Sequence, residues 1–134
     1  MKSALEALVW RRAHTLCEYC RIPQEFDLLP FQMDHIIARV HGGASSWDNL
    51  ALACFACNNH KGTNLAGRDS ETGKIVRLFH PRRHSWKTHF RREGPRIVGR
   101  TPIGRATVAV LAFNLLHRVA LRAWLLDAGL ISGS

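Results

Sequence analysis

The sequence has no uninterrupted hydrophobic run that is long enough to cross a membrane. Its longest apolar stretch, residues 108–126, is interrupted by four polar side chains, Asn114, His117, Arg118 and Arg122. A membrane-spanning helix needs about 20 mostly apolar residues, and polar side chains at those positions argue against one. The N-terminal segment also lacks an apolar region followed by a small-residue cleavage site, so we expect no secretory signal. These absences predict a cytoplasmic protein without a membrane partner.

Acidic residues are scarce beside basic ones. The 134 residues include 10 aspartates and glutamates against 19 lysines and arginines, which gives a net charge of +9. This balance favours a polyanionic partner, nucleic acid first and an anionic membrane second, although a solvated basic surface would give the same composition. The hydrophobic fraction of 46% is sufficient for a packed core, and the length favours a single domain.

Cysteine is also sparse, and all four cysteines fall in two pairs of the form Cys-x-x-Cys. The pairs are Cys17 with Cys20 and Cys54 with Cys57, separated by 33 residues. Two intervening residues allow both sulfurs of a pair to bind one tetrahedral ion, and two such pairs complete a closed four-thiolate site. In a reducing compartment this pattern favours structural zinc over disulfides or four unliganded thiols. The separation exceeds that of a compact zinc ribbon, about 15–20 residues, so a further segment is inserted between the pairs.

The segment between and just after the cysteine pairs contains polar residues and glycines in a specific order. In chain order these are Asp34, His35, Gly42, Gly43, Asn49, Asn58 and Lys61. In these motifs the chain resembles the HNH endonucleases over roughly residues 9–65, through the string CEYC…MDHIIARVHGGASSWDNLALACFACNNHKG. The block 69–105 is also similar to a subgroup of short bacterial HNH proteins. The resemblance implies a ββα-metal core and the hydrolysis of DNA phosphodiester bonds.

The residues in this pattern suit that chemistry. Phosphodiester hydrolysis needs an activated water, a Lewis acid on the phosphate and stabilisation of the departing oxygen. His35 can act as general base because imidazole titrates near neutral pH. The resemblance implies that the Asp34 carboxylate binds the metal and that Asn58 takes the third position of the motif, with Asn59 or His60 as alternative ligands. The oxygens of Asp34 and Asn58 favour Mg²⁺ or Mn²⁺ as the catalytic ion.

Further residues are expected to support the reaction or to bind its substrate. Asn49 matches the middle position of the HNH motif, which implies that it holds the loop and orients the base, and we count it with His35 as catalytic. Arg39, His41 and Lys61 are the predicted nucleic-acid-binding residues, with a merely solvated position as the alternative for His41. Additional basic residues could neutralise phosphates without reading sequence. They are Arg82, Arg83, Lys87, Arg91, Arg92, Arg96 and Arg100.

The predicted fold class is α+β, with a ββα-metal (HNH) core and a four-cysteine zinc knuckle flanked by an N-terminal helix and a long C-terminal helix. Residues 1–66 form the nuclease core in this prediction. Residues 67–134 form a basic hairpin or loop and a C-terminal helix that packs on the core, within one domain overall. In the first half of the chain the patterns predict a helix over 4–16 after a Ser3–Glu6 capping box, a strand over 31–38, a short element from 46 and a short helix from 58. In the second half they predict a strand over 74–79, a loop or edge strand over 80–100, and a helix over 102–127 capped by Thr101.

The predicted C-terminal helix is apolar around most of its circumference. Only Asn114, Arg118 and Arg122 form a narrow polar stripe along it. A helix of this kind is buried or pairs with a partner. We therefore expect packing on its own domain or, alternatively, a homodimer interface, because two-fold dimers are the commonest oligomers.

The main functional prediction is a DNA endonuclease with structural Zn²⁺ and catalytic Mg²⁺ or Mn²⁺. The alternative is a non-catalytic, zinc-stabilised module that only binds nucleic acid. The joint presence of Asp34, His35, Asn49 and Asn58 favours the enzyme, because a binding module does not need these residues at these positions. A zinc-stabilised protein-interaction domain would leave the charge of +9 unexplained.

Overall fold

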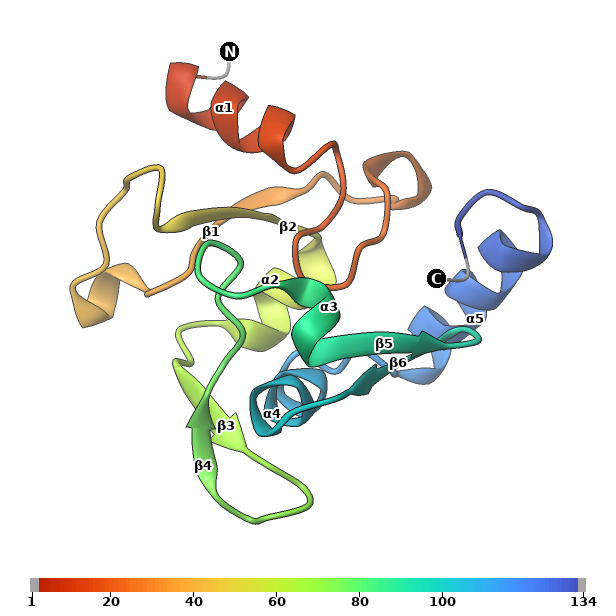
Figure 1. Cartoon of the computed structure of the whole chain (residues 1–134). Coiled ribbons are helices and arrows are strands. Elements are labelled where there is room, and N and C mark those ends of the chain that lie inside the picture. Colours follow the sequence, from red (N-terminus) through yellow and green to blue (C-terminus); the bar gives the residue numbers. More distant parts are fainter. Residues whose placement is uncertain (1–2, 133–134) are drawn as a thin grey trace. The chain divides into compact units, whose positions relative to one another are not determined.

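The computed structural model describes residues 3–132 of the chain. Short helices alternate with two-stranded antiparallel hairpins, which confirms the predicted α+β class (Figure 1). The chain divides into two compact units. The N-terminal unit comprises the chain up to Leu65 together with His80–Arg83, and the C-terminal unit comprises Ala66–Phe79 and the chain from His84 onward. Within residues 3–132, no helix is long and apolar enough to span a membrane.

The N-terminal unit contains a β-hairpin between two helices, with two single-turn 3-10 helices in its loops. Its elements are α1 (Ala4–Arg12), η1 (Gln24–Phe26), β1 (Gln32–His35), η2 (Arg39–His41), β2 (Leu50–Ala53) and α2 (Phe55–Lys61). β1 and β2 pair antiparallel, from Gln32 opposite Ala53 to His35 opposite Leu50. All four residues of β2 are buried, whereas exposure varies along β1. The predicted strand and the predicted helix after the second cysteine pair are therefore present with shifted bounds.

Helix α1 begins at the predicted capping box. The Ser3 hydroxyl oxygen accepts a hydrogen bond from the backbone N–H of Glu6 at 3.1 Å, which satisfies an amide that has no partner inside the helix. The helix is shorter than predicted because His14 and Thr15 have positive φ angles of 53° and 58°. This left-handed conformation cannot continue a right-handed helix. The resulting bend leads the chain into the first cysteine pair.

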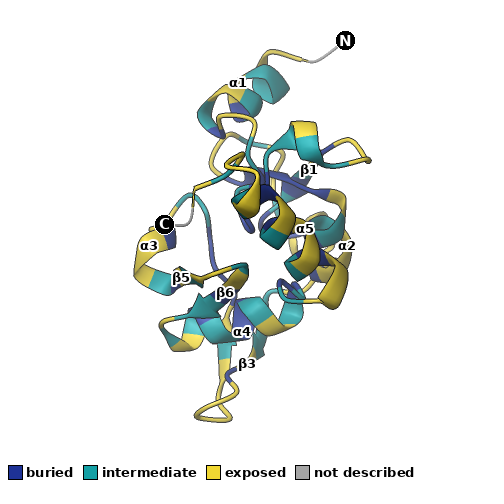
Figure 2. Ribbon diagram, turned by 90° about the vertical axis from the view of Figure 1, so that its right-hand side faces the viewer, coloured by how far each residue is buried: buried dark blue, intermediate teal, exposed yellow. Residues whose placement is uncertain are grey.

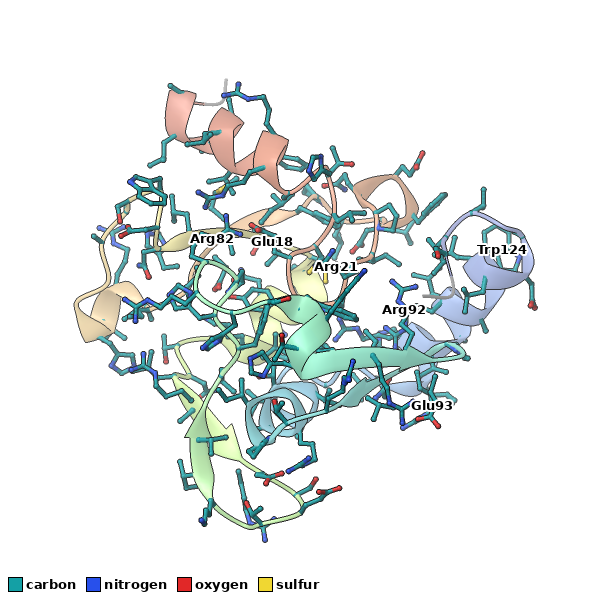
Figure 3. The ribbon with its side chains drawn as sticks, viewed as in Figure 1. Glu18, Arg21, Arg82, Arg92, Glu93 and Trp124 are labelled. Atoms are coloured by element: carbon teal, nitrogen blue, oxygen red, sulfur yellow. The ribbon has the colours of Figure 1, made fainter. Side chains whose placement is uncertain are left out.

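The short segment His80–Arg83 belongs to the N-terminal unit although it lies far from it in sequence. The guanidinium group of Arg82 forms an ion pair with the carboxylate of Glu18. Figure 3 shows these two side chains next to each other, with Glu18 lying inside the first cysteine pair. A residue distant in sequence therefore fixes the segment that carries Cys17 and Cys20.

The C-terminal unit is built from two hairpins and three helices. Its elements are β3 (Ala66–Arg68), β4 (Ile75–Arg77), α3 (Trp86–His89), β5 (Phe90–Glu93), β6 (Arg96–Gly99), α4 (Pro102–Val110) and α5 (Leu116–Asp127). β3 pairs with β4 and β5 with β6, both antiparallel. A Cβ atom on Gly104 would lie 2.0 Å from the carbonyl oxygen of His89, and one on Gly99 would lie 2.3 Å from the backbone nitrogen of Arg105. These glycines let α4 pack directly against β6 and the end of α3.

The prediction of one long C-terminal helix is wrong, because residues 102–127 form two helices. α4 begins as predicted, with the Thr101 hydroxyl accepting a hydrogen bond from the N–H of Gly104 at 3.0 Å. It ends before Leu111, and Ala112 has a positive φ of 52°. The side-chain amide of Asn114 then pairs with both backbone groups of Ile97, at 2.9 and 2.7 Å. The break allows this connection to bind the edge of β6.

The polar stripe of the predicted helix faces the interior. Arg118 and Arg122 are only 6% and 3% exposed, whereas Leu116 and Trp124 on the same helix are 87% and 61% exposed. The ribbon of α5 accordingly carries both buried and exposed positions (Figure 2). The buried guanidinium groups bind backbone carbonyls of the connection between α4 and α5, as in the 2.7 Å bond from Arg122 to Phe113. Carbonyls freed by the break in the helix are thereby satisfied.

Candidate functional site

The four cysteines come together in the N-terminal unit. Their sulfur atoms all lie within 4.8 Å of one another, no disulfide joins them, and each residue is at most 2% exposed. The Sγ atoms of Cys20 and Cys54 are 3.7 Å apart. Ligands of a tetrahedral zinc ion at the usual Zn–S distance of about 2.3 Å are about 3.8 Å apart. The cluster therefore has the donor set and spacing of a structural zinc site.

The local backbone positions the sulfurs for this role. Cys54 is the N-cap of α2, and its sulfur accepts the N–H of Cys57 at 3.4 Å. The sulfur of Cys17 accepts the N–H of Cys20 at 3.5 Å in the same way. Burial raises the pKa of the Cys17 and Cys57 thiols well above the usual value. Four adjacent thiolates in this buried position consequently require a cation to balance them.

Asp34 lies in a buried network rather than at an open surface. It is 3% exposed, and its Oδ2 accepts a hydrogen bond from the Tyr19 hydroxyl at 2.5 Å. The ammonium group of Lys61 lies 3.2 Å from both carboxylate oxygens and donates to the carbonyl of His35 at 3.2 Å. Burial raises the pKa of Asp34, and Lys61 and Tyr19 act in the opposite direction. The network joins the first cysteine pair, β1 and α2.

His35 follows Asp34 on β1 and is half-buried. Successive side chains of a strand point to opposite faces, so its imidazole lies away from the face of Asp34. Its Nε2 atom forms a 2.8 Å hydrogen bond with the hydroxyl of Ser45. The imidazole is therefore held by the loop between β1 and β2.

Asn49 fixes that loop. Its Oδ1 accepts the N–H of Ile37 at 2.9 Å, and its Nδ2 donates to the carbonyls of Ile37 and Ala44 at 3.0 and 2.8 Å. A Cβ atom on Gly43 would lie 1.7 Å from the Ile37 carbonyl oxygen, so only glycine fits there. The loop that carries Ser45 is thus closed by Asn49 and by a close backbone contact.

Asn58 is the central residue of α2 and its Nδ2 donates to Oε1 of Gln32. Gln32 lies two residues before Asp34 on β1, so both point to the same face of the strand. Asn58 and Asp34 are therefore associated with one face of β1, whereas Asn59 and His60 are exposed farther along α2. Carboxylate and amide oxygens suit a hard divalent ion. An ion at Asp34 would have to share the carboxylate with the Lys61 ammonium or displace it.

The predicted nucleic-acid-binding residues differ in their surroundings. Arg39 and His41 are exposed in η2, and His41 Nε2 lies 3.0 Å from the carbonyl oxygen of Thr63. Lys61 is 1% exposed and ion-paired with Asp34. In this structure Lys61 presents no charge at the surface to a phosphate.

Sequence reasoning missed three partners of the site, namely Tyr19, Gln32 and Ser45. Tyr19 is the only tyrosine in the chain and lies inside the first cysteine pair, which is a signal that could have been noticed. Gln32 and Ser45 carry no such signal, because only the pairing of β1 and the fold of its loop bring them to Asn58 and His35.

Comparison with known proteins bears on this arrangement. Residues 17–64 match the family model of the HNH endonucleases. The resemblance is confirmed for this segment. The HNH segment begins at the first cysteine and contains both cysteine pairs, the β1–β2 hairpin and α2. Comparisons with curated proteins and with solved structures gave no match.

Proposed function

We propose that this protein is a metal-dependent DNA endonuclease that hydrolyses phosphodiester bonds. The observation that carries the proposal is the HNH match over residues 17–64, which contains the Asp34-His35 pair, Asn49 and Asn58 in one compact unit. A protein that used this segment only as a zinc-stabilised scaffold would not need a half-buried imidazole held by a loop in this way.

In the proposed reaction His35 is the general base. An imidazole nitrogen takes a proton from the attacking water, and the hydrogen bond between His35 and Ser45 orients the ring. Asn49 is a positioning residue, because its three hydrogen bonds fix the loop that carries Ser45. Arg39 and His41 are exposed and are proposed to contact substrate phosphates.

Two kinds of metal are part of the proposal. Zn²⁺ bound by Cys17, Cys20, Cys54 and Cys57 would hold the first cysteine pair against α2. Mg²⁺ or Mn²⁺ held by the oxygens of Asp34 and Asn58 would supply Lewis-acid stabilisation of the phosphate and of the departing oxygen. Lys61 then has to leave the Asp34 carboxylate or share it. Four cysteines kept reduced for zinc also favour a cytoplasmic location.

One observation favours the second candidate, a non-catalytic module that only binds nucleic acid. The Asp34 carboxylate is buried and already neutralised by Lys61, as expected of a structural ion pair. The two candidates differ in whether His35 is needed for cutting.

The test is the conversion of supercoiled plasmid to nicked or linear DNA by the purified chain with Mg²⁺ or Mn²⁺. We expect cutting by the wild type, loss of cutting in His35→Ala, and retained cutting in His117→Ala, which removes an exposed histidine of α5. EDTA should stop the reaction, and added Mg²⁺ should restore it in protein whose zinc content is unchanged. Absence of cutting by zinc-loaded wild type that still binds DNA would leave the binding module.

A further inference from the structure

The basic charge of this protein does not lie in the HNH segment. Residues 17–64 contain three basic and five acidic residues, a net charge of −2. The C-terminal unit contains eleven lysines and arginines against four acidic residues, a net charge of +7. A segment with net negative charge exerts no net long-range attraction on DNA, so Arg39 and His41 add only local phosphate contacts. The attraction has to come from elsewhere in the chain.

The hairpin β3–β4 presents basic side chains on one face. Its register pairs Ala66 with Arg77 and Arg68 with Ile75, so Arg68, Ile75 and Arg77 share a face. These three residues are exposed, Ile75 by 70%, and Lys74 is exposed beside them in the turn. Figure 2 shows the exposed turn at the end of this hairpin.

Arg68 and Arg77 are diagonal neighbours across the strands. Diagonal side chains of a two-stranded sheet start only about 7–8 Å apart, and like charges that close repel each other. Within residues 3–132, no acidic side chain forms an ion pair with Arg68, Lys74 or Arg77. An external polyanion would relieve this repulsion.

The opposite side of the hairpin is firmly attached to the rest of its unit. Asp69, at the end of β3, accepts hydrogen bonds from Nε and Nη2 of Arg105 at 2.7 and 3.2 Å. It also accepts the Thr72 hydroxyl at 2.6 Å. Arg105 and Thr72 hold the pKa of Asp69 well below its usual range. A Cβ atom on Gly67 would lie 2.6 Å from Val110 of α4. The basic face is therefore presented by a rigid ribbon, which lowers the entropy lost on binding.

The second hairpin of this unit is a weaker candidate. On β5–β6, Glu93 lies opposite Arg96 and 3.4 Å from Arg91 in an ion pair. Its positive charge is thus partly neutralised within the hairpin itself. This difference between two hairpins of similar size provides a matched control.

We propose that Arg68, Lys74 and Arg77, around Ile75 on the outer face of β3–β4, bind the phosphate backbone of duplex DNA. This supplies the positive charge that the HNH segment lacks as a whole, and the choice of DNA as the polyanion rests on the proposed function. A two-stranded ribbon has the size to lie along a DNA groove. Ala66 directly follows the last residue of the N-terminal unit in this region, and His80 of that unit follows Arg77 by three residues. The hairpin is thus joined to the HNH-containing unit at both ends without a long linker.

The test measures binding of the full chain to a short labelled duplex at several salt concentrations. His35→Ala is the background, so that cutting does not interfere. In Arg68→Gln/Lys74→Gln/Arg77→Gln we expect the slope of log Kd against log salt to fall by up to about 2.7, since each phosphate contact contributes about 0.9. Lys87→Gln/Arg91→Gln/Arg96→Gln, with one change on α3 and two on β5–β6, removes the same charge and should change the slope by less than half as much. Arg68→Lys/Arg77→Lys keeps the charge and should keep the slope.

An equal loss in both triple variants, with zinc content and circular dichroism unchanged, would overturn the hairpin proposal in favour of diffuse attraction. Hairpin-dependent binding of phosphatidylserine vesicles or RNA in preference to duplex DNA would overturn it as well. Plasmid cutting is measured separately. Hairpin-dependent binding without cutting would support this proposal and contradict the proposed nuclease activity. Cutting by the wild type with equal losses of binding in the two triple variants would support the nuclease activity and contradict this proposal.

Discussion

The Asp34 carboxylate shows how much the chemistry of one residue depends on its neighbours. Its position before His35 suggests an open metal ligand, yet it is 3% exposed and bound by Tyr19 and Lys61. A buried carboxylate with an ammonium beside it is stable only as a pair, because either charge alone would be buried without compensation. Lys61 therefore maintains the charge state of Asp34, in addition to any role that it takes when substrate binds.

Removing the ammonium group should reveal this dependence. We expect Lys61→Met to lower the free energy of unfolding by about 3–5 kcal/mol near pH 8, because the buried carboxylate loses its partner. Burial raises the pKa of Asp34 above its unfolded value, and loss of Lys61 raises it further. In the variant the folded state then binds a proton at Asp34 more tightly than the unfolded state does. The stability lost in Lys61→Met should therefore become smaller as pH falls.

Urea denaturation at pH 8 and pH 5.5 measures this effect. Adding Asp34→Asn to Lys61→Met should recover much of the stability at pH 8, since the unpaired charge is gone. A loss that is the same at both pH values and in the double variant would show that Lys61 acts through packing alone.

At the scale of elements, the connection between α4 and α5 explains why the C-terminal segment is polar where it is buried. A break in a helix leaves carbonyl groups without partners. Arg118 donates to the carbonyls of Leu111 and Ala112 at 2.7 and 3.0 Å, and Arg122 donates to the carbonyl of Pro95 at 2.5 Å. The stripe that resembles a solvent-facing edge therefore closes a bend in the chain. The outer side of α5 carries exposed apolar residues, and the homodimer through this region stays a prediction.

For two substitutions on α5 the expected effect on stability is the reverse of what residue type suggests, because the arginine is buried and the tryptophan is exposed. We expect Arg122→Leu to destabilise the protein by about 3 kcal/mol, because several charge-assisted bonds to buried acceptors are lost. Trp124→Ala removes a large aromatic side chain that is 61% exposed, and it should change stability by less than about 1 kcal/mol. Chemical denaturation of both variants gives the comparison. A larger loss for Trp124→Ala would mean that its outer face is covered in solution, as in the predicted dimer.

At the scale of the whole molecule, the proposed catalytic residues and most of the positive charge lie in different parts of the chain. The HNH match lies in a segment of net charge −2, while the C-terminal unit has a net charge of +7. Such a division separates the chemistry from the long-range attraction that brings a polyanion to the protein.

This division predicts a steep salt dependence of the proposed nuclease. At protein concentrations below saturation, plasmid cutting should fall at least about tenfold between 50 and 200 mM salt, because counterions compete with phosphate contacts. The rate with saturating protein should change much less, since His35 and its loop are not part of the basic surface. Cutting that is equally insensitive to salt at both protein concentrations would contradict a binding role for the C-terminal unit.

The sequence by itself determined the features that depend on short spacing. Two residues between cysteines decide that two sulfurs can reach one ion. The order of Asp34-His35 and Asn49 between the pairs, with Asn58 directly after the second pair, indicated the HNH segment that the family comparison confirmed. The capping box at Ser3 and the start of α4 at Thr101 are also local, because each needs only a side chain and an amide three residues away. Such features are set within one turn of the chain.

Only the tertiary structure decided which polar side chains are buried. Lys61, Arg118 and Arg122 are basic residues that a sequence pattern assigns to the surface, and the fold buries each beside an acceptor outside its own helix. The tertiary structure also decided where α4 ends and which side of α5 faces inward. It likewise brought Tyr19 and Ser45 to their partners. Burying a charged or polar group is favourable only where a specific partner meets it. Those partners are brought together by the packing of distant segments, which residue type and periodicity do not encode.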